Sequence, residues 1–416
     1  MSKEKRRVPK LRFPGFTEDW EQRKLSDILV ERNEQQVETN EYPLMSFVQG
    51  HGVIPKGERY DRSFLVLDQS KKYKRTELGD FIYSSNNLET GSIGINKTGK
   101  AVISPVYSIF YGVSIGDSQF IGIMSLLPRF IAKMIRFRQG VVYGQWRIHE
   151  KDFLDISILI PSEAERTKIT KLILSIEELI TLHQRKLNNL KLKKKALLQK
   201  LFPKNGERYP ELRFPGFTDA WEQRKFLDLL DTQNGIRRGP FGSSLKKDSF
   251  VKKSDYVVYE QQNAIYDNYV TRYFISKEKY NELIRFNIQP GDFIMSGAGT
   301  IGRISMVPDG IKKGVFNQAL IRFKVDKNSV NPLYFLKFMQ SDMMQKQLTQ
   351  ANPGSAMTNL VPMDELKKWD VTIPSLEEQN KISNFINQID ESITLHQRKL
   401  ERLQEVKKGL LQKMFV

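Results

Sequence analysis

Two short motifs in the sequence come close to sites that bind nucleotides or modify bases. The first runs from Gly94 to Ala101 and has the spacing G-x4-G-K of a phosphate-binding loop. Such a loop needs Ser or Thr after the lysine, because that hydroxyl binds Mg²⁺. Ala101 occupies this position, and no helical pattern follows Lys100. We therefore predict a turn and no nucleotide site.

The second motif is Asn331-Pro332-Leu333-Tyr334, which is similar to the Asn-Pro-Pro-Tyr that amino-methyltransferases use to hold a flipped adenine. Leu333 replaces the second proline, and no glycine-rich S-adenosylmethionine loop precedes the motif. Proline is favoured at the first position of a helix, where its missing N–H has no partner to lose. The motif therefore predicts a helix that begins near Pro332.

Residue types for covalent or metal chemistry are scarce. The chain has no cysteine and four histidines, His51, His149, His183 and His396. Disulfides, thiol catalysis and cysteine-type zinc sites are excluded, and a histidine-rich metal centre is not expected. No Ser/His/Asp set and no carboxylate–lysine nuclease cluster stands out. We predict no catalytic residue, no metal site and no cofactor in this chain.

Basic, amide and aromatic residues are interleaved in two regions, residues 26–159 and 227–372. Arg can make two hydrogen bonds to guanine and Asn or Gln two to adenine, while cationic side chains contact phosphates. Each cluster alone is typical of a polar surface loop, but their recurrence favours DNA binding. The candidate DNA-binding residues are Lys71, Lys72, Lys74, Arg75, Ser85, Asn86, Gln145, Arg147, Arg237, Arg238, Ser243, Ser244, Gln262, Asn263, Asn352 and Ser355.

The charge balance agrees with a polyanionic partner. The 416 residues include 66 Lys and Arg against 48 Asp and Glu, a formal net charge of +18. Such an excess favours nucleic acid or an anionic membrane surface as a partner. No apolar run approaches the ~20 residues that span a bilayer. We expect a soluble, cytoplasmic protein.

An internal repeat organises the segments that would carry these clusters. The sequence LRFPGFTEDWEQRKL at residues 11–25 returns as LRFPGFTDAWEQRKF at residues 212–226, with 12 of 15 positions identical. The far ends also match: ITLHQRKL occurs at 180–187 and 393–400, and KKALLQKLF (194–202) returns as KKGLLQKMF (407–415). Two copies are too few for a solenoid. The pattern therefore indicates a duplication whose middle segments have diverged.

Each copy ends in a predicted long helix. Apolar residues recur there at alternating intervals of four and three, which over such a length predicts a coiled-coil seam. The seam positions are Ile169, Ile173, Ile176, Ile180, His183, Leu187, Leu190, Lys194, Leu197 and Leu201, and then Ile382, Ile386, Ile389, Ile393, His396, Leu400, Leu403, Lys407, Leu410 and Met414. The predicted N-caps and their capping-box partners are Ser162 with Glu165 and Ser375 with Glu378.

Two polar residues interrupt each seam at matching places: His183 and Lys194 in the first helix, His396 and Lys407 in the second. A polar residue within an apolar seam can fix the register of the paired helices, and this is the preferred interpretation. A pH-sensitive or metal-binding pair of histidines is the alternative.

The middle segments have the pattern of mixed α/β domains. They share the tetrapeptide GDFI, at Gly79–Ile82 and Gly291–Ile294. The predicted strands are Phe64–Leu67, Val102–Ile103, Tyr256–Tyr259, Phe293–Met295 and Leu320–Val325, and the predicted helices are Leu126–Arg138 and Leu333–Gln345. Residues 203–211 form a polar link between the two halves.

The sequence resembles the specificity subunits of type I restriction-modification systems. The resemblance rests on LRFPGF-x3-WE-x2-K at the head of each half, on the IPS tripeptides that enter the two helices, and on their LLQK[LM]F ends. The segment GPFGS-x-L at residues 239–245 also matches, in the second half only. Nearly the whole chain is covered.

The resemblance implies an α+β protein with a pseudo-twofold internal repeat. Two mixed α/β target recognition domains would each bind one half of a bipartite DNA site and be joined by two long helices in an antiparallel coiled coil. The implied segments are a first recognition domain with its repeat head (1–159), a central helix (160–202), a linker with the second head and second recognition domain (203–372), and a C-terminal helix (373–416).

The resemblance also implies partners. Two modification subunits would bind S-adenosylmethionine and methylate adenine at N6, and two restriction subunits would cleave DNA with ATP and Mg²⁺. The chain itself would be non-catalytic, and its helices would set the spacer and dock the modification subunits. Two other interpretations stay open: a self-contained DNA-modifying enzyme with unrecognised motifs, and a coiled-coil interaction scaffold whose basic charge is incidental.

Overall fold

The computed structural model describes residues 7–48, 51–55, 70–85, 88, 92–114, 116–142, 145–204, 206–350 and 363–416, with the side chains of 140–142, 145, 146, 349 and 350 left out. The predicted strand Phe64–Leu67 lies outside these residues. The chain divides into two compact units. Unit 1 comprises residues 1–184 and 398–416, and unit 2 comprises residues 185–397.

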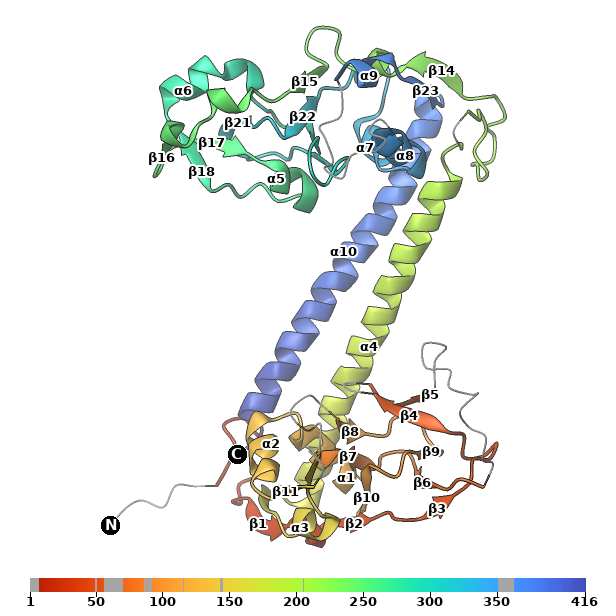
Figure 1. Ribbon diagram of the computed structural model, residues 1–416, viewed down its shortest axis with the longest axis vertical. Helices are drawn as coiled ribbons and strands as arrows, with labels where there is room; N and C mark the ends of the chain where they lie inside the picture. The colour runs from red at the N-terminus through yellow and green to blue at the C-terminus, as the bar shows by residue number, and fades with distance from the viewer. Residues whose placement is uncertain are drawn as a thin grey trace. The chain divides into compact units, whose positions relative to one another are not determined.

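Unit 1 is built of short strands and helices (Figure 1). Its strands are β1 (Glu21–Lys24), β2 (Leu29–Glu31), β3 (Gln35–Gln36), β4 (Met45–Val48), β5 (Gly52–Pro55), β6 (Tyr73–Thr76), β7 (Phe81–Tyr83), β8 (Ile93–Ile95), β9 (Ala101–Ile103), β10 (Ser108–Gly112), β11 (Gln139–Val142), β12 (Gln145–Arg147) and β13 (Ser157–Ile160). Its short helices are η1 (Leu25–Asp27), α1 (Asp117–Met124), α2 (Pro128–Ile135) and α3 (Glu150–Leu154).

The core of unit 1 lies beneath a four-stranded antiparallel sheet with strand order β2-β10-β7-β8. Phe81 stacks on Phe153 at a ring distance of 5.6 Å, and Tyr83 stacks on Phe110 at 5.9 Å. Helix α1 packs against three strands of this sheet. Burial of such large aromatic side chains contributes strongly to the stability of this core.

Unit 2 repeats this architecture with different loops. Its strands are β14 (Glu222–Lys225), β15 (Ile236–Arg238), β16 (Phe250–Val251), β17 (Tyr256–Tyr259), β18 (Tyr273–Ile275), β19 (Phe293–Ser296), β20 (Ile304–Met306), β21 (Lys313–Phe316), β22 (Leu320–Phe323) and β23 (Asp370–Ile373). Its short helices are η5 (Phe226–Leu229), η6 (Gly242–Ser244), η7 (Lys247–Ser249), α5 (Gln261–Tyr266), α6 (Lys277–Glu282), η8 (Ile284–Phe286), α7 (Pro332–Met339), α8 (Asp342–Gln350) and α9 (Met363–Lys368).

The main sheet of unit 2 has the order β15-β22-β19-β20, which corresponds strand for strand to that of unit 1. The shared GDFI tetrapeptide reaches into β7 in unit 1 and β19 in unit 2, so it marks equivalent strands. Three predicted strands are confirmed within β9, β17 and β19, and the fourth, Leu320–Val325, overlaps β22, which ends at Phe323. The prediction of one helix over Leu333–Gln345 was wrong, because α7 and α8 are separated at Ser341.

Two helices of 38 residues each, α4 (Glu163–Lys200) and α10 (Leu376–Lys413), end the two repeats. Each contributes one end to unit 1 and the other to unit 2. Ser162 Oγ and Ser375 Oγ accept the amides of Glu165 and Glu378 at 3.4 Å, which confirms the predicted N-caps. The carboxylates of these two glutamates bind arginines of the repeat heads, a contact that the capping-box pattern does not predict.

Every predicted seam position is buried or half-buried, as the heptad pattern requires. In unit 1, Ile169 lies in one core cluster with Met414, whereas Glu177, further along α4, pairs with Lys407 at 2.7 Å. The two helices therefore run antiparallel there. Unit 2 shows the same arrangement: Leu201 shares a core with Ile382, and Lys194 pairs with Asp390 at 2.6 Å.

The two repeat heads fold back onto helix ends in equivalent ways. In unit 1 the ring of Trp20 meets Phe415 edge-on at 6.2 Å, and Leu11 N donates to Lys413 O at 2.8 Å. In unit 2 Trp221 meets Phe202 edge-on at 6.2 Å, and Leu212 N donates to Lys200 O at 2.8 Å. Each head thus packs on the helix that ends the other repeat.

A bidentate ion pair fastens each head to the start of a long helix. Arg12 binds Glu165 at 2.7 and 2.8 Å in unit 1, and Arg213 binds Glu378 at 2.8 Å through both oxygens in unit 2. Both carboxylates are fully buried.

Within the described part of the chain, no helix has both the length and the apolar character needed to cross a membrane.

Candidate nucleic-acid interface

The basic candidates of unit 2 lie on β15 at one edge of the main sheet. Arg237 stands opposite Arg322 of β22, and Arg238 stands opposite Ile321. Burial lowers the pKa of Arg238, and its Nε and one terminal nitrogen have no hydrogen-bond partner among the described residues. Arg238 as a whole is half-buried, and its two buried nitrogens without acceptors are unfavourable, so a rotation of the side chain toward a phosphate or base oxygen would satisfy them.

The loop after β15 holds Ser243 and Ser244 in the short helix η6. Gly239 N donates to Leu320 O at 3.0 Å, and Ser244 N donates to Phe241 O at 2.8 Å. A Cβ at Gly239 would lie 1.9 Å from Asn317 O, so only glycine fits there. The loop therefore has a fixed backbone that presents Ser243 to solvent.

The two amide candidates of unit 2, Gln262 and Asn263, lie on α5. Asn263 is fully buried: its Oδ1 accepts Glu260 N at 2.6 Å and its Nδ2 donates to Asn268 O at 2.6 Å. These bonds cap α5 and close the turn after it. Gln262 is half-buried and reaches Glu260 at 3.4 Å. Asn263 is thus held by internal contacts, and its predicted DNA contact stays a prediction.

The basic candidates of unit 1 divide into two pairs. Lys71 and Lys72 are exposed just before β6. Lys74 is 7% exposed and pairs with Glu150 at 3.8 Å. Arg75 pairs with Glu77 at 2.7 Å and stacks on the ring of Tyr42 at 4.5 Å. The first pair is available to phosphates, whereas the second pair is occupied within the unit.

The remaining candidates of unit 1 surround β12. Arg147 is exposed, and Ser85 is half-buried with its Oγ accepting Ile148 N at 3.0 Å. Gln145 is in β12, but its side chain is not described. Asn86, Asn352 and Ser355 lie outside the described residues. The polar seam residues His183, Lys194, His396 and Lys407 are all half-buried.

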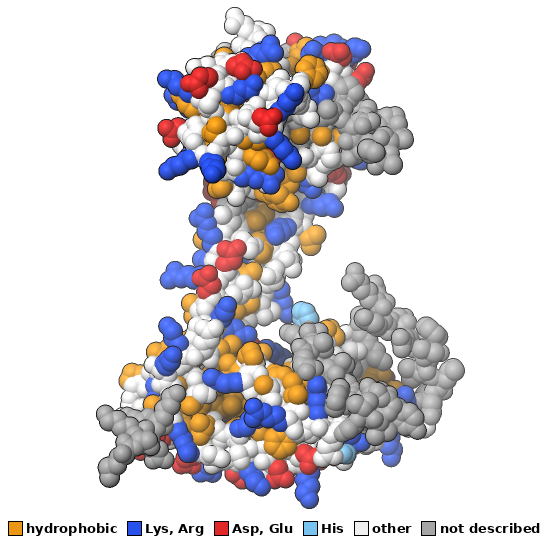
Figure 2. All heavy atoms as spheres, turned by 60° about the vertical axis from the view of Figure 1, so that its left-hand side comes forward, with side chains coloured by type: hydrophobic (Ala, Val, Ile, Leu, Met, Phe, Trp, Pro, Cys, Tyr) orange, Lys and Arg blue, Asp and Glu red, His pale blue; other side chains and the backbone are white. Residues whose placement is uncertain are grey.

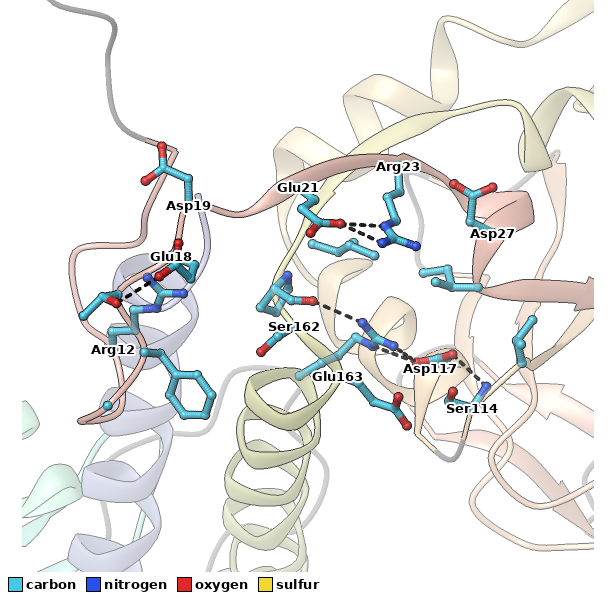
Figure 3. A pocket seen from close by; sticks show the side chains of 18 residues that line it. Arg12, Glu18, Asp19, Glu21, Arg23, Asp27, Ser114, Asp117, Ser162 and Glu163 are labelled. Carbon is cyan, nitrogen blue, oxygen red and sulfur yellow. Dashed lines mark hydrogen bonds and ion pairs between the residues drawn. The ribbon is translucent and has the colours of Figure 1, made fainter.

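A cavity of about 560 Å³ opens in unit 1 beside the start of α4 (Figure 3). Two ion pairs lie in its wall: Glu21 with Arg23 at 2.7 Å, and Asp117 with Arg166 at 2.6 Å. Asp117 also accepts Ser114 N at 2.8 Å. The Asp117–Arg166 pair joins α1 to α4, so this part of the cavity wall has a structural role.

Cationic side chains are dispersed over the face of the described residues that Figure 2 shows. Figure 2 shows Lys and Arg interspersed with apolar and acidic side chains on the visible face of both units. Two features were not predicted from the sequence. One is the exposure of Phe241 in the middle of GPFGS, and the other is the pair of acids, Glu177 and Asp390, that bind the seam lysines. The spacing of the repeat could have found the acids, since 390 − 177 equals the helix offset of 213.

Comparison with known proteins agrees across sequence and structure. Residues 219–405 match the family model described as the type I restriction modification DNA specificity domain. The MjaVIII specificity subunit of Methanocaldococcus jannaschii is 20% identical over 64% of this chain and 62% of its own length. The chain thus spans less than two thirds of that relative.

A second relative aligns along almost the whole chain. The putative MjaX specificity subunit of the same organism is 21% identical over 95% of this chain and 92% of its own length. The crystal structure of a type I S subunit from M. genitalium superposes with a TM-score of 0.62 at 12% identity, covering 98% of this chain and 99% of that one. This last likeness shows a shared fold.

Proposed function

Because this chain belongs to the specificity subunits of type I restriction-modification systems, we propose that it selects the DNA sequence on which such a system acts. Each unit binds one half of a bipartite site. The observation that carries the proposal is the duplication. The two units have main sheets of the same strand order and equivalent packing of heads on helix ends, but their loops differ. Two different readers on one repeated scaffold suit two unlike half-sites.

In this proposal, residues 1–159 and 203–372 contain the target recognition domains, and residues 160–202 and 373–416 supply the joining helices. The helices set the number of base pairs between the half-sites, since a helix rises ~1.5 Å per residue. The uninterrupted α4 and α10 support such a role. DNA contacts come from the exposed basic and polar candidates, with Lys71, Arg147 and Ser243 among the most accessible.

The partners are two modification subunits and two restriction subunits, which carry the S-adenosylmethionine, ATP and Mg²⁺. The chain itself carries out no chemistry. Support comes from the exposed strands β1 and β14, which share the sequence EQRK and differ in no residue. Exposed residues are not held by packing, so their identity in both copies suits one kind of partner that docks twice.

Methylome sequencing with and without the gene tests the proposal. We expect N6-methyladenine in a bipartite motif with a fixed degenerate spacer, present only when the chain and its modification subunits are expressed together. An unchanged methylome with intact modification subunits would reject the proposal. If the purified chain alone transferred labelled methyl groups from S-adenosylmethionine to DNA, the self-contained enzyme would replace it.

The spacer can be tested separately. Four residues inserted between Lys191 and Lys195 lengthen α4 by ~6 Å, and the spacer should change by about two base pairs. A four-residue insertion after Lys204, in the link beyond α4, is the matched control and should leave the spacer unchanged. An identical spacer in both variants would contradict the role of the helix as a ruler.

A further inference from the structure

Phe241 stands on the loop of unit 2 with 86% of its side chain exposed. Single exposed apolar residues are common on protein surfaces and alone imply nothing. Phe241 differs because its backbone is pinned on both sides, by the Gly239 contact to β22 and by the bond from Ser244 N. These two backbone hydrogen bonds fix the loop in a conformation that exposes the aromatic ring of Phe241 to solvent.

A cavity of about 130 Å³ lies against the backbone neighbours of Phe241, although the ring itself does not line it. One water needs only ~10–15 Å³ of such space, so the cavity admits a much larger group. Pro240 and Gly242, the two neighbours of Phe241, form part of its wall. The other lining residues are Leu245, Phe250, Val258, Glu260, Tyr273, Asn317 and Gln318.

The lining combines a flat aromatic wall with hydrogen-bonding groups. Phe250 and Tyr273 stack on each other at a ring distance of 4.6 Å and 20° between planes. The carboxylate of Glu260 is held by Arg272 at 2.9 Å. Gln318 is exposed at the rim. Its side-chain amide lies close to Gly242, since a Cβ added at Gly242 would be 3.0 Å from Gln318 Oε1. Amide groups beside an aromatic face are what a planar heterocycle requires.

Cationic residues flank the loop at both ends. Arg237 and Arg238 precede it, and Lys246 and Lys247 follow it. The structure gives none of the four an ion pair within its described ranges. An apolar ring between unpaired cations is the arrangement by which proteins insert wedges between base steps while neutralising the phosphates around them.

We propose that Phe241 and the cavity lined by its neighbours Pro240 and Gly242 form a nucleobase site: the ring enters the base stack of the half-site bound by unit 2, and the base it displaces occupies the cavity. This inference rests on the proposed function. The first insert lacks GPFGS, so unit 1 reads its half-site without this device. Unit 2 therefore reads one position by the shape and edge of an unstacked base.

The test uses the full chain with its modification subunits, bound to DNA that carries 2-aminopurine at one position at a time across both half-sites. An unstacked 2-aminopurine is strongly fluorescent. We expect a several-fold rise at one position of a single half-site with the wild-type chain. The rise should be lost with Phe241→Ala and kept with Phe241→Trp, and Phe241→Ala should weaken binding about tenfold.

The matched control is Ile284→Ala, which truncates another exposed apolar side chain of unit 2 in η8. It should change neither the fluorescence nor the affinity. The inference is overturned if no position responds, or if the response persists in Phe241→Ala. A response confined to the adenine that becomes methylated would assign the extrusion to the modification subunit and also overturn it.

A second variant tests the cavity without the wedge. Gln318→Ala removes an exposed amide at the rim, so folding should be unaffected. We expect the methylated motif to become degenerate at the position found by fluorescence, while the other positions stay specific. Specific methylation by the wild-type chain with an unaltered motif in Gln318→Ala would reject the cavity but leave the proposed function standing.

Discussion

Unit 1 and unit 2 agree in most of the repeated scaffold and differ in the loops and small sheets that surround it. The heads, their arginine–glutamate ion pairs and the sheet order coincide. The pinned loop of residues 239–245 and the small sheet β16-β18-β17-β21 belong to unit 2, and a different set of short strands takes their place in unit 1. Scaffold and reader can therefore change independently.

One buried contact shows how the same place can be filled in two ways. In unit 1, Arg166 forms an ion pair with Asp117 and donates to Pro161 O at 3.2 Å. At the matching place of unit 2, Gln379 accepts Asn331 N at 2.9 Å and donates to Pro374 O at 3.0 Å. The first contact joins α4 to α1 through charges, and the second joins α10 to the start of α7 through neutral amides.

A second contact is the same in both units. Glu177 on α4 binds Lys407 of α10 and Lys97 of the domain, and Asp390 on α10 binds Lys194 of α4 and Lys337 of the domain. Each acid thus joins both helices and one domain. The seam lysines that the sequence assigned to register have their partners here.

The largest effect is expected from the buried tryptophans of the two heads. Trp20→Ala and Trp221→Ala each remove a side chain that is at most 2% exposed, and each should lower the stability of its own unit by about 3–5 kcal/mol. Unit-resolved hydrogen exchange should show the loss in one unit at a time. Equal loss of protection in both units would mean that they do not behave as separate bodies.

The next effect separates the charged contact from the neutral one. Asp117→Ala leaves Arg166 buried without its partner and should cost about 3–5 kcal/mol, whereas Gln379→Ala should cost about 1–3 kcal/mol. Thermal unfolding measures both. The double change Arg166→Gln with Asp117→Asn copies the polarity of unit 2 and should recover most of the loss. A double variant as unstable as Asp117→Ala would show that the charge itself is required.

A smaller effect concerns the acid of unit 1. Burial would raise the pKa of Glu177, but the charges and hydrogen bonds of Lys97 and Lys407 outweigh it, so the pKa lies below the ordinary value of 4.5. Glu177→Gln should cost about 2 kcal/mol, between the values for exposed and buried pairs. The ionised carboxylate stabilises the fold above pH 4.5 and loses this contribution as the pH falls through the lowered pKa.

Urea titrations of the wild type and Glu177→Gln at several pH values measure this difference. It should be full at neutral pH and shrink in acid, because the protonated wild type resembles the variant. Asp390→Asn is the counterpart in unit 2. A gap between wild type and Glu177→Gln that stays constant down to pH 3 would show that charge is not the source.

The smallest effect on stability is expected at the exposed strands. Arg23→Ala and Arg224→Ala break surface pairs with Glu21 and Glu222 and should change stability by less than about 0.5 kcal/mol. Their effect should fall on assembly: each should release one modification subunit, measured as the mass of the complex. Unaltered assembly in the double variant would remove EQRK from the docking surface.

Periodic features were predictable from the sequence, because they depend on neighbours along the chain. The alternating spacing of four and three residues predicted α4 and α10, and the serines that follow prolines, Ser162 and Ser375, predicted where these helices begin. The long-range partners were not predictable. Lys74 and Lys72 look alike in the sequence, yet Lys74 is buried beside Glu150 because β6 brings it there.

The same limit applies to the candidate interface. Asn263 has the chemistry to bind adenine, but its amide is used to close a turn. The exposure of Phe241 could not be predicted from the motif that contains it, since exposure is a property of the folded loop. Residue type therefore indicates which chemistry is available, and only the fold decides which side chains remain free to use it.

The packing of the first head on the end of α10 has a consequence for biosynthesis. Unit 2 is one continuous stretch, residues 185–397, and can close as soon as that stretch has left the ribosome. Unit 1 needs residues 398–416, so Trp20 can meet Phe415 only after the whole of unit 2 has been translated. Contacts between such distant residues form slowly. The half that is translated first is therefore the half that finishes folding last.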